Sequence, residues 1–72
     1  MNREQIIEAI DRERDRQNKK FGWHRRNDNH TRYLILSEEV GEVSKAILQG
    51  RPFLDEVLQV AAVAVAWLEG DL

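Results

Sequence analysis

Strong helix-breaking residues occur at two places before the C-terminal end of this chain. The first is Gly22 with the polar residues 25–29 after it, and the second is the Gly-Arg-Pro turn at residues 50–52. No segment alternates apolar and polar residues as a strand does, whereas apolar residues recur at helical spacing. The sequence therefore predicts an all-α protomer of three helices. They are expected at about 3–20, 29–49 and 52–69.

The residues at these breaks also predict how the helices begin and end. Asp28 or Asn29 can cap the second helix, and Gly50 can end it in a left-handed conformation. Pro52 suits the first turn of the third helix, where its missing N–H is no loss. Because the connection is short, the second and third helices are predicted to form an antiparallel hairpin.

Length and composition limit the classes of protein to consider. The 72 residues are predicted to form a single domain, 1–72, and they contain no cysteine for a disulfide or a thiolate site. The longest apolar stretch, residues 60–68, is about half of the ~20 residues that span a bilayer. Most basic residues alternate with acids on a helical pattern, which is typical of a solvated face. We therefore expect a cytoplasmic protein that binds neither membranes nor nucleic acid.

The first predicted helix is weakly amphipathic. Its apolar residues lie near its start, and residues 11–20 are all polar or charged. Because a polar segment buries little apolar surface, the second half of this helix is expected to pack little without a partner.

Two carboxylates lie on the apolar side of the second helix. At about 100° per residue, seven of its apolar side chains fall in one continuous arc of about 160°. Glu39 lies inside this arc, Glu42 lies at its edge, and Glu38 points away from it. The arc consists, in angular order, of Ile35, Ala46, Val43, Leu36, Ile47, Val40 and Tyr33.

The third helix is apolar around most of its circumference and also carries a carboxylate. Glu56 lies amid Val60, Val63 and Trp67. A helix that is apolar nearly all round must be buried on more than one side, which one small hairpin cannot provide. The sequence therefore predicts a homo-oligomer, a homodimer or a homotetramer, whose helical bundle includes this helix from more than one subunit.

Buried carboxylates need a neutralising partner, because an unpaired buried charge is costly and close like charges repel. Glu39 and Glu42 share a helix face and can bind one ion together. The antiparallel return of the chain is expected to bring Glu56 within about one helical turn of Glu42 in height. Hard oxygen donors without histidine or cysteine suit Mg²⁺ or Mn²⁺ better than zinc. An alternative is that the three glutamates pair with Arg or Lys across a subunit interface.

The acidic residues also resemble a known family signature. The run EEVGE at residues 38–42, followed after a short gap by Glu56, resembles the EExxE…ExxD signature of the MazG-like, all-α nucleoside triphosphate pyrophosphatases. Residues 13–17 with 21–23 are similar to the segment that precedes this signature in small members. Residues 60–64 resemble the helix that follows it.

This resemblance implies a house-cleaning hydrolase that converts a nucleoside triphosphate, often a non-standard one, to its monophosphate and pyrophosphate. It implies that Glu39, Glu42 and Glu56 are ligands of Mg²⁺, and that Glu38 positions or deprotonates the attacking water. Such chemistry needs cations to neutralise charge on the phosphate oxygens and a group that orients the nucleophile.

Gln59 departs from the signature, whose last acid is expected at this position. Its amide oxygen can coordinate Mg²⁺ or hold a bound water, but it supplies no negative charge. The departure leaves three alternatives: fewer ions, weaker binding, or a fold that has lost catalysis.

Four other residues are candidates for substrate binding. Lys45, one turn after Glu42, is the best-placed cation for the phosphates or for catalysis, although it can also pair with a nearby glutamate. Phe21 and Trp23 can stack on a nucleobase or plug a helix end, and Gln17 can hydrogen-bond a base edge. The sequence does not say which base.

Two alternatives to the pyrophosphatase remain open. One is a catalytically weak or inactive relative that serves as a nucleotide-binding or helical assembly module, as Gln59 suggests. The other is phosphoribosyl-ATP pyrophosphatase, which belongs to the same helical superfamily.

Overall fold

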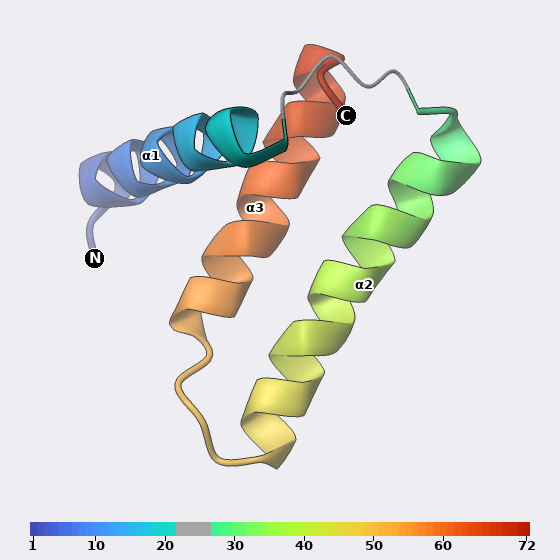
Figure 1. Ribbon diagram of the computed structural model, residues 1–72. Helices are drawn as coiled ribbons and strands as arrows, with labels where there is room; N and C mark the ends of the chain where they lie inside the picture. The colour runs from blue at the N-terminus through green and yellow to red at the C-terminus, as the bar shows by residue number, and fades with distance from the viewer. Residues whose placement is uncertain (22–26) are drawn as a thin grey trace.

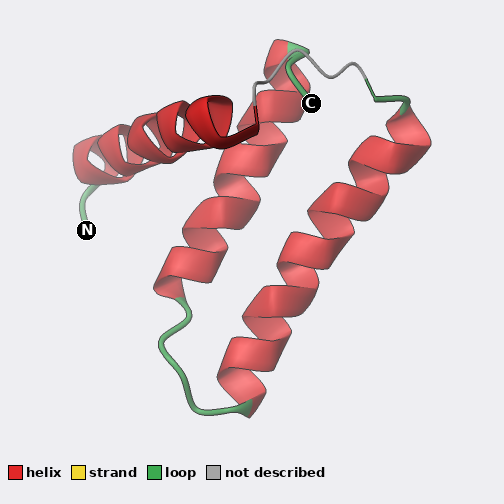
Figure 2. Cartoon of the chain, viewed as in Figure 1, coloured by secondary structure: helices red, strands yellow, loops and turns green. Residues whose placement is uncertain are grey.

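The computed structural model describes residues 1–21 and 27–72. These residues form three α-helices and no strand, as Figures 1 and 2 show. The helices are α1 (Arg3–Phe21), α2 (Asn29–Leu48) and α3 (Leu54–Glu69). The predicted all-α class is confirmed, and no helix in the described part is long and apolar enough to cross a membrane.

The ends of α2 form as the sequence predicts. The Asp28 carboxylate accepts a hydrogen bond from the Thr31 N–H at 2.8 Å, which satisfies a free donor of the first turn. At the other end Gly50 is left-handed, with φ of 65°. The Arg51 N–H then bonds back to the Ala46 carbonyl at 2.9 Å, which is the Schellman pattern for closing a helix.

The start of α3 differs from the prediction. Pro52 lies outside the helix, because Phe53 is its N-cap and takes a non-helical conformation, with φ of −124° and ψ of −7°. The C-terminal motif of α2 already uses residues 50 and 51. Pro52 and Phe53 are therefore needed to turn the chain before α3 begins at Leu54.

The helices are arranged around α3, which packs against both α1 and α2. Figure 1 shows α3 lying beside α2 after the turn at residues 49–53, with α1 inclined to both. Val63, Ala66 and Leu72 form the buried cluster, and the half-buried Ile35 and Trp67 pack against it with Leu36. Ala46 on α2 and Ala62 and Ala66 on α3 are fully buried, and such small side chains allow helices to pack closely.

The second half of α1 packs through polar side chains, so the expectation that it packs little is wrong. Arg14 and Gln17 are each only 5% exposed. The Arg14 guanidinium donates to Glu69 at 2.9 Å and to Asp71 at 3.2 Å. These bonds attach α1 to the C-terminal end of α3. A polar side chain can be buried where its hydrogen bonds are satisfied, which an apolar pattern does not reveal.

The C-terminal residues fold back into the protein. Gly70 is left-handed with φ of 81°, and the Asp71 N–H bonds to the Ala66 carbonyl at 2.9 Å. This turn places Leu72 in the core, where it is fully buried. The Leu72 carbonyl accepts from the Asn27 N–H at 3.2 Å and from the Arg32 guanidinium at 2.9 Å. The last residues therefore join α3 to the start of α2.

Candidate metal centre

Glu39 is the central residue of the predicted site. α2 holds its side chain half-buried, and the Oε2 atom is buried with no hydrogen-bond partner within residues 1–21 and 27–72. Burial raises the pKa of Glu39, and neighbouring carboxylates raise it further, in decreasing order those of Glu56, Glu38, Glu42 and Glu13. An orphaned buried carboxylate oxygen in a negative environment is the kind of group that a cation neutralises.

The helical positions of the other glutamates are confirmed. Glu42 on α2 and Glu56 on α3 are half-buried, whereas Glu38 is exposed. Glu56 lies seven residues, about two helical turns, before the buried Val63 on α3, and its half-buried side chain agrees with the wheel. The packing of α3 on α2 thus brings the Glu56 charge to Glu39, although 17 positions separate them in the sequence.

These side chains do not form a closed set of ligands. Within residues 1–21 and 27–72, no three His, Cys, Asp or Glu side chains lie close enough together to hold a metal ion. The donor set still fits a hard divalent cation, because it consists of carboxylates and includes the unpartnered Oε2 of Glu39. Glu39, Glu42 and Glu56 remain the residues that the sequence predicts would hold such an ion.

The remaining residues predicted for the phosphates and the metal lie near the same helices. Gln59 is half-buried on α3, three residues after Glu56. Lys45 is exposed in the last turn of α2 and makes no ion pair with a carboxylate of the described chain. Its freedom is consistent with either a phosphate contact or a solvated surface charge.

The structure says less about the residues that were predicted to bind the base. Gln17 is buried, and its amide bonds to Arg14 at 3.3 Å and to Glu13 at 3.4 Å. A base edge can reach it only if these bonds are exchanged. Trp23 and the side chain of Phe21 lie outside the residues that the structure describes.

Sequence reasoning missed Glu13 as a part of this environment. Its side chain is only 12% exposed, and it lies on the side of α1 that includes the buried Ala9 and Gln17. Arg16 donates to both carboxylate oxygens at 2.6 Å, and this hydrogen bonding lowers the pKa of Glu13. Ala9, Glu13 and Gln17 are four residues apart, so they lie on one side of a helix. On this side, polar residues continue the apolar face of α1, and this spacing could have identified Glu13 from the sequence.

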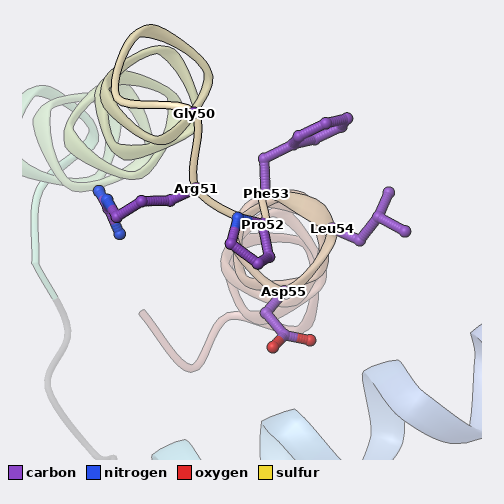
Figure 3. A pocket seen from close by; sticks show the side chains of 6 residues that line it. All are labelled: Gly50, Arg51, Pro52, Phe53, Leu54 and Asp55. Carbon is purple, nitrogen blue, oxygen red and sulfur yellow. The ribbon is translucent and has the colours of Figure 1, made fainter.

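Two hollows lie on the surface near the first turn of α3. One, of about 390 Å³, lies between α1 and α3, and Glu13, Arg16 and Leu58 are among its lining residues. The other, of about 520 Å³, is formed by residues 50–55. Figure 3 shows that the side chains of Arg51, Phe53 and Asp55 point in different directions there, so the second hollow has no converging polar groups.

Comparisons with known proteins do not assign this chain to a family. No protein-family model, no curated protein and no solved structure matches it. The resemblance to the MazG-like enzymes therefore stays a prediction from residues 13–17, 21–23, 38–42, 56 and 60–64.

Proposed function

We propose that this chain is a Mg²⁺-dependent nucleoside triphosphate pyrophosphatase whose metal ligands are Glu39, Glu42 and Glu56. The observation that carries the proposal is the buried, unpartnered Oε2 of Glu39, surrounded by the charges of four other glutamates. No described Arg or Lys pairs with Glu39, Glu42 or Glu56 within the protomer. A divalent cation would remove both the desolvation cost and the mutual repulsion.

Each residue of the site has a chemical role in this proposal. A bound Mg²⁺ would neutralise charge on the phosphate oxygens. Glu38, exposed beside Glu39, would orient or deprotonate a water that attacks the α-phosphorus. The bond from the α-phosphorus to the bridging oxygen then breaks, and pyrophosphate leaves. Lys45 would contact the phosphates, and Gln59 would contribute a neutral oxygen.

We also propose that the working form is a homodimer or a homotetramer built on the antiparallel α2–α3 hairpin. Among the described residues, four of the six buried apolar side chains are alanines, so the protomer has a small core. Val57 and Leu68 are 44% and 88% exposed. With Ala61 and Ala64 they follow one another at helical spacing along α3, which is the pattern of a helix face that packs on another helix.

A second candidate function is a nucleotide-binding or assembly module with little or no catalysis. It is supported by Gln59, which lacks a charge, and by the glutamates, which do not converge on one point in the described structure. In this case Mg²⁺ and nucleotide bind but the phosphate bond is not cleaved.

Pyrophosphate release from a panel of nucleotides with Mg²⁺ separates these functions. The panel should contain canonical and modified nucleoside triphosphates and phosphoribosyl-ATP. Turnover of one or more triphosphates is expected, and turnover of phosphoribosyl-ATP alone would identify the related enzyme instead. Nucleotide binding without any turnover would refute the enzyme and leave the binding module.

The metal site is tested separately by melting temperature. Mg²⁺ is expected to raise the melting temperature, and Glu56→Gln is expected to remove this effect while helical content is retained. Asp55→Asn is the matched control, because Asp55 is exposed and lies about 100° around the helix from Glu56. If Glu56→Gln instead destabilises the protein in the absence of metal and Mg²⁺ has no effect on either form, the glutamates are ion-pair partners across an interface.

A further inference from the structure

A stripe of uncharged residues runs along the side of α2 that faces away from its buried residue, Ala46. Its members lie about 120° or more around the helix from Ala46. They recur at alternating spacings of three and four residues, which is the heptad spacing of a helix that packs on another helix. The stripe consists of Leu34, Ser37, Gly41, Ser44 and Leu48.

No other helix of the described chain covers this stripe. α1 and α2 both pack on α3, and α1 does not pack on α2 (Figure 1). Leu34 and Leu48 are 52% and 87% exposed, and a Cβ on Gly41 would meet no atom within 4 Å. Because 33% of the residues in the chain are charged, five exposed positions in a row without a charge are unlike a solvated helix face.

The charges beside the stripe indicate a second copy of α2 as its occupant. Glu38 and Lys45 lie along one edge of the stripe, and both are exposed. Neither forms an ion pair within residues 1–21 and 27–72. Glu38 lies three residues before Gly41, and Lys45 lies four residues after it. In an antiparallel pair of α2 helices that cross at Gly41, two-fold symmetry therefore places Glu38 beside the partner's Lys45.

The same crossing also brings the exposed leucines together. Leu34 and Leu48 lie seven residues before and seven residues after Gly41, so Leu34 meets the partner's Leu48 at both ends of the contact. The small residues between them allow the two helices to approach closely. A parallel pair would instead place Glu38 beside the partner's Glu38, where like charges repel.

We infer that the outer side of α2 pairs about Gly41 with an antiparallel α2 of a second copy, and that this contact joins two dimers into a tetramer. The inference rests on the homo-oligomer proposed above, whose apolar α3 face forms the dimer, and it selects the tetramer. A tetramer with this symmetry contains the α2 contact twice, so two contacts that are each weak act together.

The first test is the mass of the full chain by light scattering. The unmodified chain is expected to have the mass of four copies. Leu48→Glu places a charge at each end of the contact and is expected to give two copies. Gln49→Glu is the matched control, because it adds the same charge at the next exposed position, about 100° around the helix, and should remain a tetramer.

The charge pair is tested by reversal, with mass as the measurement because Glu38 and Lys45 also have roles in the proposed function. Glu38→Lys places two lysines together at each end of the crossing, so it is expected to shift the tetramer toward dimers. Adding Lys45→Glu to the same chain restores the opposite charges and is expected to restore the tetramer.

Disulfide formation tests the direction of the helices, since the chain contains no cysteine of its own. A mixture of Leu34→Cys and Leu48→Cys chains is expected to form a disulfide between the two variants on oxidation. Neither variant alone should do so, because identical positions at the ends of an antiparallel pair are about 21 Å apart, too far for a disulfide.

The outcomes separate this contact from the proposed assembly. A dimeric unmodified chain, or a Leu48→Glu chain that remains a tetramer, overturns the inference, and the α3 dimer stands if Leu68→Glu still gives single chains. A single-chain mass for the unmodified protein refutes both. A disulfide in Leu48→Cys alone would show a parallel pair and also overturn the inference. Should Leu48→Glu lose its helical circular dichroism, the mixed disulfide decides: its formation supports the inference, and its absence overturns it.

Discussion

Glu39 is a half-buried carboxylate whose Oε2 atom is buried with no hydrogen-bond partner among the residues that the structure describes. Because its pKa is raised in the folded protein, the charged form is disfavoured there relative to the unfolded chain. Glu39 therefore favours the folded protein at pH values below the pKa that it has in the unfolded chain. This contribution is lost as pH rises through the higher pKa that it has in the folded protein. At neutral pH without metal, Glu39 is a source of instability.

Replacing this charge should stabilise the metal-free protein. Glu39→Gln is expected to raise the free energy of unfolding at neutral pH by about 1 kcal/mol, because an unpaired buried oxygen no longer carries a charge. The gain should shrink as pH falls toward 4.5, the ordinary pKa of a glutamate side chain. Urea unfolding at several pH values, without metal, measures this effect. Glu38→Gln, at an exposed position, is the control, and a loss of stability in Glu39→Gln at neutral pH would contradict the prediction.

Arg14 is also a buried charged residue, but unlike the Oε2 atom of Glu39, its guanidinium has hydrogen-bond partners. Arg14→Ala should lower the free energy of unfolding by about 2–3 kcal/mol, since charge-assisted bonds and the packing of the side-chain stem are lost together. Arg12→Ala, whose side chain is 71% exposed, should change it by less than about 0.5 kcal/mol. Urea denaturation of both variants provides the comparison. Equal effects would show that the bonds to Glu69 and Asp71 do not hold α1 in place.

At the scale of the helices, two glycines of the α2 region are expected to respond to alanine substitution with opposite changes in stability. A Cβ at Gly41 or at Gly50 would meet no atom within 4 Å in the described chain. Steric contact therefore does not distinguish them, but backbone conformation does. Gly50 has φ of 65°, whereas Gly41 lies inside α2. Close packing within the protomer thus does not explain Gly41, which leaves room for a partner subunit or a ligand.

Alanine at the two positions should shift stability in opposite directions. Gly50→Ala is expected to cost about 1–2 kcal/mol, the cost of a left-handed conformation for a residue with a Cβ. Gly41→Ala is expected to stabilise an isolated protomer by about 1 kcal/mol through helix propensity. Thermal unfolding monitored by circular dichroism at low protein concentration measures both. A destabilising Gly41→Ala would indicate that another molecule packs closely at this position.

At the scale of the whole molecule, the small core predicts association. Leu68 is 88% exposed on the apolar face of α3, so a charge there should oppose packing of a second copy. The unmodified chain is expected to have the mass of a dimer or a tetramer by light scattering, and Leu68→Glu that of a single chain. Gln5→Glu adds the same charge at an exposed site near the start of α1 and should leave the assembly intact. A single-chain mass for the unmodified protein would rule out the proposed assembly.

The three helices and most of their ends follow from the sequence alone. Breakers, caps and apolar periodicity act through neighbouring residues, so Asp28, Gly50 and the wheel positions of Glu39 and Glu56 can be predicted from local rules. Pro52 was misplaced because two neighbouring motifs compete for the same short connection. Local signals do not say which of them prevails.

Only the tertiary structure brings together groups that are distant in the chain. Arg14 reaches Glu69 and Asp71, and Leu72 enters the core. These contacts depend on how α1 lies against α3. Polar residues that pack by forming hydrogen bonds with one another leave no apolar pattern in the sequence. The sequence therefore determined three helices and an acidic face, whereas the fold decided that the Oε2 atom of Glu39 is buried with no hydrogen-bond partner among the described residues, and that Arg14 attaches α1 to the end of α3.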